Sequence, residues 1–319
     1  IQLAYRTVDL SSYTYEEIQA FAGFQDCHID ILEKTFKTKI IIRSQELKFE
    51  ECEQSDALEE VVNRMFDILG EQGDIHNQDV SYLCHLACRH KLSAFEIKQL
   101  SSIGKTKSGK MIYPKTVGQA RLCDAFRKND IVFATGVAGT GKTYLAVCYA
   151  VSVLKSEKIQ KIVLTRPAVE AGESLGFLPG DMKEKVDPYL RPLYDALYEM
   201  LGVETVEKLL EKQVIEIAPL AFMRGRTLND AIVILDEAQN TTQAQMKMFL
   251  TRMGKNTQMI INGDVTQIDL IKKHDSGLMQ ACSILEDIKG IEIVHLKTSD
   301  VVRNPLVQKI IERYATIEK

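Results

Sequence analysis

Gly136-Val137-Ala138-Gly139-Thr140-Gly141-Lys142-Thr143 is the stretch that decides the fold of this chain. It fits the spacing G-x-x-x-x-G-K-[ST], and the run Ile131–Thr135 before it is typical of a buried strand. The glycines let successive backbone N–H groups turn inward as an anion-binding nest, which the positive N-terminal end of a following helix reinforces. The stretch therefore predicts a strand, a phosphate-binding loop and a helix.

The polar residues of this loop have predicted contacts with a nucleoside triphosphate. Lys142 is expected to reach the β- and γ-phosphates, and Thr143 is expected to offer its hydroxyl to Mg²⁺. The predicted cofactors are therefore ATP and Mg²⁺. We expect the nucleotide to lie against Gly136, Val137, Ala138, Gly139, Thr140, Gly141, Lys142, Thr143 and Tyr144.

The composition predicts a soluble, cytoplasmic chain of about two domains. Its 319 residues are 45% hydrophobic, but no stretch approaches the ~20 apolar residues of a membrane span, and no signal segment opens the chain. The seven cysteines are odd in number and scattered, which argues against a disulfide framework. A net charge of −4 gives no global field for polyanions, so a nucleic-acid contact must be local.

Two short segments each have two interpretations. Cys84, His85, Cys88 and His90 have metal-like spacing, but the apolar residues among them favour a core helix with buried thiols. Residues 101–118 carry Lys105, Lys107, Lys110 and Lys115 and no acidic residue. This segment is either a basic linker between domains or a local contact for nucleic acid.

Residues 1–100 are predicted to form a small α+β domain with the element order β-α-α-β-β-α. This order is compatible with the K-homology nucleic-acid-binding fold, whose binding loop reads GXXG. Here the corresponding loop, Gly23–Cys27, has no second glycine. The domain is therefore either a nucleic-acid-binding domain or a docking or oligomerisation domain. The expected elements are strands at 3–8, 39–43 and 46–49 and helices at 15–22, 29–36 and 55–69.

The rest of the chain predicts an α/β fold: a P-loop NTPase, RecA-like, with a mostly parallel sheet flanked by helices. Its apolar runs are short and rich in branched aliphatic side chains, which is typical of strands that are buried on both faces. Ligands of such sheets lie beyond the carboxyl ends of the strands. The expected strands are 131–134, 161–165, 215–218, 231–235, 259–262 and 291–296.

Carboxylates follow the strand 231–235 directly, as Asp236 and Glu237. Asp236 is predicted to hold Mg²⁺ through water, and Glu237 to polarise the water that attacks the γ-phosphate. Gln267, after the strand 259–262, is predicted to sense the γ-phosphate.

Arginines are the predicted source of charge stabilisation at the γ-phosphate. Arg303, Arg224 and Arg226 compete for this role, from the same subunit or from a neighbour. Arg166 follows the strand 161–165 and is either a contact to phosphate or nucleic acid or a solvated side chain.

Several motifs together resemble the PhoH-like ATPase family, over about residues 110 to 315. They are the phosphate loop, Leu164–Gly180, Leu235–Thr242, Asn262–Gln267 and Asp300–Pro305. The motifs also look like the first motor domain of superfamily 1 helicases. The resemblance implies an ATPase domain over residues 119–319, and adenine recognition by Gln119. It further implies RNA as a partner, ring-shaped self-association and a possible separate ribonuclease partner, since no acidic nuclease domain is visible in this sequence.

Three functions are consistent with these motifs. The first is an ATP-hydrolysing protein that unwinds or remodels RNA as a ring, because one nucleotide core of ~200 residues needs a second core from another subunit to move strands. The second is a nucleotide-gated switch or adaptor with slow hydrolysis. The third is a P-loop kinase, which the adjacent pair Asp236 and Glu237 disfavours because a kinase should exclude the attacking water.

Overall fold

The computed structural model describes residues 4–92, 101–167, 182–270, 276–302 and 313. The chain divides into two compact units, of which one takes in residues 1–100 and the other residues 101–302. The predicted extension of the ATPase domain from 303 to 319 falls almost wholly outside the described residues. Every helix in the described part of the chain is too short or too polar to cross a membrane.

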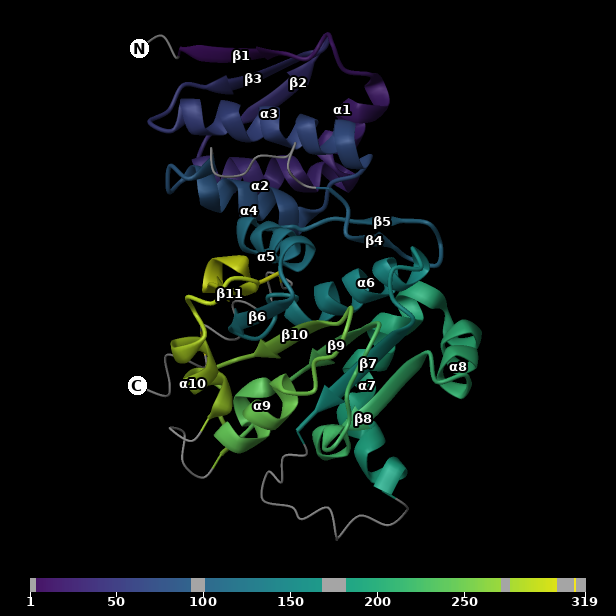
Figure 1. The fold of residues 1–319 in the computed structure, drawn as a ribbon. Coiled ribbons are helices and arrows are strands. Elements are labelled where there is room, and N and C mark those ends of the chain that lie inside the picture. The colour runs from purple at the N-terminus through teal and green to yellow at the C-terminus, as the bar shows by residue number, and fades with distance from the viewer. Residues whose placement is uncertain (1–3, 93–100, 168–181, 271–275, 303–312, 314–319) are drawn as a thin grey trace. The chain divides into compact units, whose positions relative to one another are not determined.

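The first unit has the predicted element order, with one helix added at its end. Its three strands form an antiparallel sheet in the order β1-β3-β2 (Figure 1). The face of α3 that the sequence predicts, from Leu58 to Leu69, is buried against this sheet and its helices. The elements are β1 (Tyr5–Asp9), α1 (Tyr15–Ala22), η1 (Phe24–Asp26), α2 (Cys27–Phe36), β2 (Ile40–Arg43), β3 (Glu46–Glu50), α3 (Ser55–Gln72) and α4 (Asn77–Ala87).

The loop that takes the place of GXXG is a short 3-10 helix, η1, between α1 and α2. Gln25 and Asp26 both have positive φ, and Phe24 beside them is 83% exposed. Further along, Cys84 of α4 is buried, and this burial raises the pKa of its thiol to about 12. Cys88, just beyond α4, is exposed, so the core-helix interpretation with buried thiols holds for Cys84 and not for Cys88.

The structure differs from the linker interpretation of residues 101–118. Strands β4 (Gly104–Lys105) and β5 (Met111–Ile112) pair as an antiparallel hairpin. Ile103 and Ile112 are buried in the same core as helix α6, so the hairpin belongs to the second unit. The reason is that these two apolar residues on either side of the turn are buried, while the lysines between them remain exposed.

The second unit is built on six parallel strands in the order β11-β6-β10-β9-β7-β8, which confirms the predicted α/β fold (Figure 1). Predicted and observed strands agree to within two residues at each end. The strands are β6 (Ile131–Gly136), β7 (Lys161–Arg166), β8 (Ile215–Pro219), β9 (Ala231–Leu235), β10 (Gln258–Gly263) and β11 (Ile291–Leu296).

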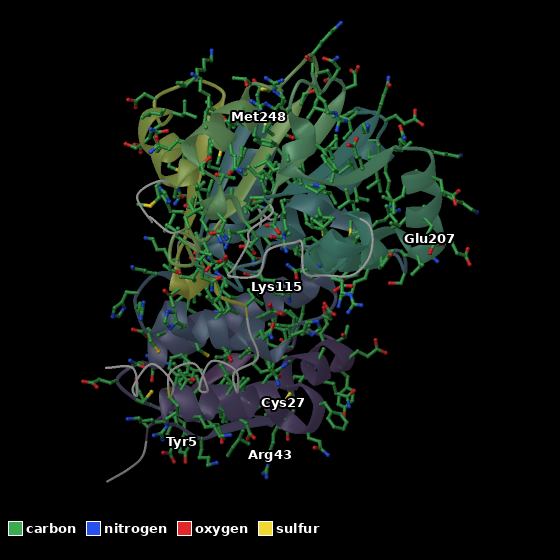
Figure 2. The ribbon with its side chains drawn as sticks, turned by 90° about the horizontal axis from the view of Figure 1, so that it is seen from below. Tyr5, Cys27, Arg43, Lys115, Glu207 and Met248 are labelled. Carbon is green, nitrogen blue, oxygen red and sulfur yellow. The ribbon has the colours of Figure 1, made fainter. Side chains whose placement is uncertain are left out.

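Helices cover both faces of this sheet because its strands carry apolar side chains on both. One face packs against α5, α6, α7 and α8, and the other against α9 and α10, where Met248 of α9 is labelled in Figure 2. The remaining elements are α5 (Val117–Lys128), α6 (Lys142–Lys155), α7 (Met182–Leu201), α8 (Val203–Glu211), η5 (Leu220–Met223), η6 (Ala238–Asn240), α9 (Gln243–Leu250), α10 (Gly277–Ile284) and η8 (Thr298–Asp300).

Candidate nucleotide site

The phosphate-binding loop lies where the sequence predicts it, between β6 and α6. Gly136 ends β6 with φ 144°, and a Cβ there would collide with the backbone carbonyl of Leu296. Gly141 caps α6 with φ 81°, in the left-handed region. These backbone angles open the loop so that its N–H groups and the N-terminus of α6 face the same space.

Lys142 is folded back over this loop. Its ammonium donates to the carbonyls of Gly136 at 2.7 Å and Val137 at 2.9 Å. Burial lowers the pKa of Lys142, and the carboxylates of Asp264, Asp236 and Glu237 oppose that shift. The ammonium of Lys142 donates to neutral carbonyl oxygens here. A phosphate group placed in the loop would bring a negative charge into contact with this buried cation.

Asp236 connects the loop to the end of β9. Its Oδ1 accepts a hydrogen bond from the Thr143 hydroxyl at 2.7 Å, which brings together the two residues predicted for Mg²⁺. Its Oδ2 accepts from Arg166, from Nε at 2.9 Å and from a terminal nitrogen at 2.6 Å. The Asp236 side chain is only 4% exposed, so its charge is compensated inside the protein.

Glu237 is held by Gln239, which is 1% exposed. The Gln239 amide nitrogen donates to Glu237 Oε2 at 2.6 Å and to the backbone carbonyl of Gln267 at 3.2 Å. The amide oxygen of Gln239 accepts from the backbone N–H of Asp264 at 3.0 Å. One buried side chain therefore joins the predicted base to the segment that carries the predicted phosphate sensor.

Unpaired polar atoms lie buried at the carboxyl ends of the strands. Among the described residues, Asp264 Oδ2, Thr165 Oγ1 and both amide atoms of Asn262 have no hydrogen-bond partner. Buried polar atoms without partners are rare in proteins. Their concentration at the strand ends marks this edge as one that takes polar ligands or water.

Gln119 braces the phosphate loop. Its amide nitrogen donates to the Thr140 carbonyl at 3.0 Å, and its amide oxygen accepts from the backbone of Lys115 (labelled in Figure 2) at 2.7 Å. In this arrangement both ends of the amide are used within the protein. Adenine recognition by Gln119 stays a prediction.

The three candidate arginines differ in their surroundings in the structure. Arg226 forms two hydrogen bonds with Glu216, at 2.5 and 2.9 Å, and these bonds together with Lys161 lower the pKa of Glu216 to about 2. Arg224 is exposed on the turn after η5. Arg303 falls outside the described residues.

Most of the predicted site residues line one cavity of about 330 Å³, within the range of small-molecule sites, whereas its lining does not include Gln119, Gly136, Val137 or Thr140. Thr143 and Asp236 offer the oxygen ligands that Mg²⁺ prefers, and the partnerless Asp264 Oδ2 lies beside them. The glycine-opened loop fits a phosphate chain, so the residues present fit ATP and Mg²⁺. The lining consists of Ala138, Gly139, Gly141, Lys142, Thr143, Tyr144, Arg166, Pro192, Asp236, Glu237, Gly263, Asp264 and Gln267.

The comparisons agree with this geometry. The family model described as PhoH-like protein matches residues 111–315, which include every motif of the site. This chain belongs to the PhoH-like family. A PhoH-like protein of Bacillus subtilis is 52% identical over 94% of both chains, and one of Synechocystis is 44% identical over 95% of this chain and 93% of the relative. Protein PhoH of Escherichia coli is 41% identical over 70% of this chain and 64% of that protein.

The PhoH-like chain has the fold and the site of a nucleotide-binding ATPase. Among solved structures, the large terminase of a thermophilic bacteriophage shares 11% identity, with a TM-score of 0.37 over 59% of this chain and 46% of that chain.

Two residues of the site have no role in the sequence-based prediction. Gln239 holds Glu237, and its only signal is its place two residues after the acid. Asp300 accepts hydrogen bonds from the backbone of Gly118 at 3.0 Å and of Lys297 at 2.8 Å. Since Val302 also donates to the Gly139 carbonyl at 3.0 Å, the segment after β11 supports the phosphate loop.

Proposed function

We propose that this PhoH-like protein hydrolyses ATP and uses the energy to unwind or remodel RNA as a cytoplasmic ring. The observation that carries the ATPase part is the convergence of Lys142, Thr143, Asp236 and Glu237 on one cavity. Bound Mg²⁺ would neutralise phosphate charge. The chain's own groups then have separate tasks: Lys142 binds phosphate, Asp236 orients Thr143, and Glu237 takes a proton from water.

Two variants test the ATPase part. Lys142→Ala should abolish ATP binding because it removes the cation that contacts the phosphates. Glu237→Gln should keep ATP binding and lose hydrolysis because it removes only the water-polarising carboxylate. Binding is measured with a fluorescent ATP analogue and hydrolysis by phosphate release. Wild-type turnover in Glu237→Gln would remove the assignment of the base.

The RNA part is tested by ATP turnover across a panel of single-stranded, double-stranded and structured RNAs. The support for it is the hairpin β4–β5, whose turn presents Lys105, Lys107 and Lys110 at the surface. An RNA-remodelling enzyme should be stimulated by at least one of these RNAs. Slow turnover that no RNA changes would favour the nucleotide-gated switch instead.

The ring part rests on the strand order. Arg224 follows the edge strand β8, which lies four strands away from β6 and its phosphate loop. Arg224 is exposed after η5, on this edge of the sheet. From there it is a candidate to act on the γ-phosphate of a neighbouring subunit, through a head-to-tail contact that closes into a ring. A ribonuclease, if one is involved, is a separate partner.

A further inference from the structure

The ion pair between Arg166 and Asp236 is the least explained contact of the site. A simple solvated arginine would extend into water, but the Arg166 side chain is only 15% exposed. Two hydrogen bonds of Arg166 go to Asp236 Oδ2, at 2.9 and 2.6 Å. Its terminal nitrogen also lies 3.7 Å from Glu237 Oε1, so one guanidinium faces both acids of the site.

The sheet register fixes this placement. Thr165 of β7 pairs with Leu235 of β9, and the backbone N–H of Asp236 donates to the Thr165 carbonyl at 2.9 Å. Arg166 and Asp236 are each the next residue along their strand. Parallel strands end at the same edge of a sheet, so the two side chains are brought together by the backbone ladder itself.

Both oxygens of Asp236 already accept hydrogen bonds. Oδ1 accepts from the Thr143 hydroxyl, and Oδ2 accepts from Arg166. A dication at Asp236 and a guanidinium on the same carboxylate repel each other strongly in a buried site. We propose that Arg166 is the resident counter-ion of Asp236 and that Mg²⁺ displaces it, so that Arg166 sets the metal affinity of the site. This inference rests on the proposed ATPase function.

The charges that line the cavity give the sign of the effect. Among the described residues, its lining has three carboxylates, Asp236, Glu237 and Asp264, and two cations, Lys142 and Arg166. Removing Arg166 makes the charge of this described lining more negative by one and removes two hydrogen bonds to Asp236 Oδ2. A close opposite charge shifts a carboxylate pKa by ~1–3 units, and the same attraction acts on a bound cation. We therefore expect about tenfold tighter metal binding in Arg166→Ala.

The displaced guanidinium has a second carboxylate within reach. Glu237 Oε1 lies 3.7 Å from the terminal nitrogen of Arg166, and Glu237 is the predicted base. Arrival of the metal therefore changes which acid Arg166 neutralises. This exchange makes the end of β7 respond to occupancy of the nucleotide site.

The experiment measures Mn²⁺, as a stand-in for Mg²⁺, binding to the full chain saturated with ADP by electron paramagnetic resonance. Arg166→Ala should bind Mn²⁺ about tenfold more tightly than the wild type, and Arg166→Lys should fall between them because it keeps the charge but not the paired donors. Arg226→Ala is the matched control. It removes an equally paired arginine from the same unit and should leave Mn²⁺ affinity unchanged.

An unchanged or weaker Mn²⁺ affinity in Arg166→Ala would overturn the proposal. The ion pair between Arg166 and Asp236 would then only support the fold. If circular dichroism shows that Arg166→Ala is unfolded, Arg166→Gln takes its place, since it keeps a hydrogen-bond donor without the charge. Tighter binding supports the proposal there too, and unchanged binding refutes it. ADP affinity in the presence of a chelator is measured separately, because a wild-type chain that does not bind ADP would refute the proposed function itself.

Discussion

Replacing Gln239 with leucine should slow ATP hydrolysis without weakening ATP binding. Gln239 is 1% exposed and donates at 2.6 Å to Glu237 Oε2, so a buried donor holds a charged group whose side chain is 42% exposed. Such bonds contribute about 1.5–3 kcal/mol. If the bond holds Glu237 against the attacking water, kcat should fall by roughly 10- to 100-fold, since ~1.4 kcal/mol is a factor of ten.

The same substitution has a stability cost that can be measured separately. Leucine is of similar size, but it leaves the buried backbone N–H of Asp264 without its acceptor. An unsatisfied buried donor costs about 1–3 kcal/mol. The assays are single-turnover phosphate release, binding of a fluorescent ATP analogue and unfolding in urea.

Gln258→Leu is the control for this prediction. Gln258 opens β10, at the other end of the strand from the site, and donates to the carbonyls of Phe126 at 2.6 Å and Asn129 at 2.7 Å. It should lower the free energy of unfolding and leave kcat unchanged. The reasoning fails if Gln239→Leu loses stability but keeps wild-type kcat, because Gln239 would then only support the fold.

Three further predictions concern charge. Glu216 has its pKa lowered to about 2 by Arg226 and Lys161, so the stability that this carboxylate contributes is full above its ordinary pKa of about 4.5 and is lost as the pH falls towards 2. Urea unfolding at pH 6 and pH 3 should show a larger drop for the wild type than for Glu216→Gln; equal drops would contradict the assignment. Exchanging the four lysines of residues 101–118 for alanine should weaken RNA binding and flatten its salt dependence by about 0.7 per lost phosphate contact, whereas an unchanged slope would show that they make none. The exchanged residues are Lys105, Lys107, Lys110 and Lys115. Mixing Lys142→Ala with Arg224→Ala should restore part of the ATP turnover if Arg224 acts on a neighbour, and mixed rings that stay inactive would exclude this role.

The sequence by itself determined the fold class and the phosphate loop. The loop could be predicted because its chemistry is local: eight consecutive residues fix both the backbone angles and the contacts. The strands could be predicted because burial on both faces requires unbroken apolar runs. Asp236 and Glu237 could be placed at the sheet edge for the same reason, since they directly follow such a run.

The tertiary structure alone decided which distant residues meet. Arg166 and Asp236 are 70 residues apart, and only the pairing of β7 with β9 makes them partners. The pairing of Arg226 with Glu216 likewise distinguishes it from Arg224, although the two arginines look alike in sequence. Residues 101–118 have the composition of a linker, but two buried isoleucines hold them as a hairpin. Composition depends only on which residues are present in a segment. Burial and pairing depend on which other residues lie next to that segment in the folded protein.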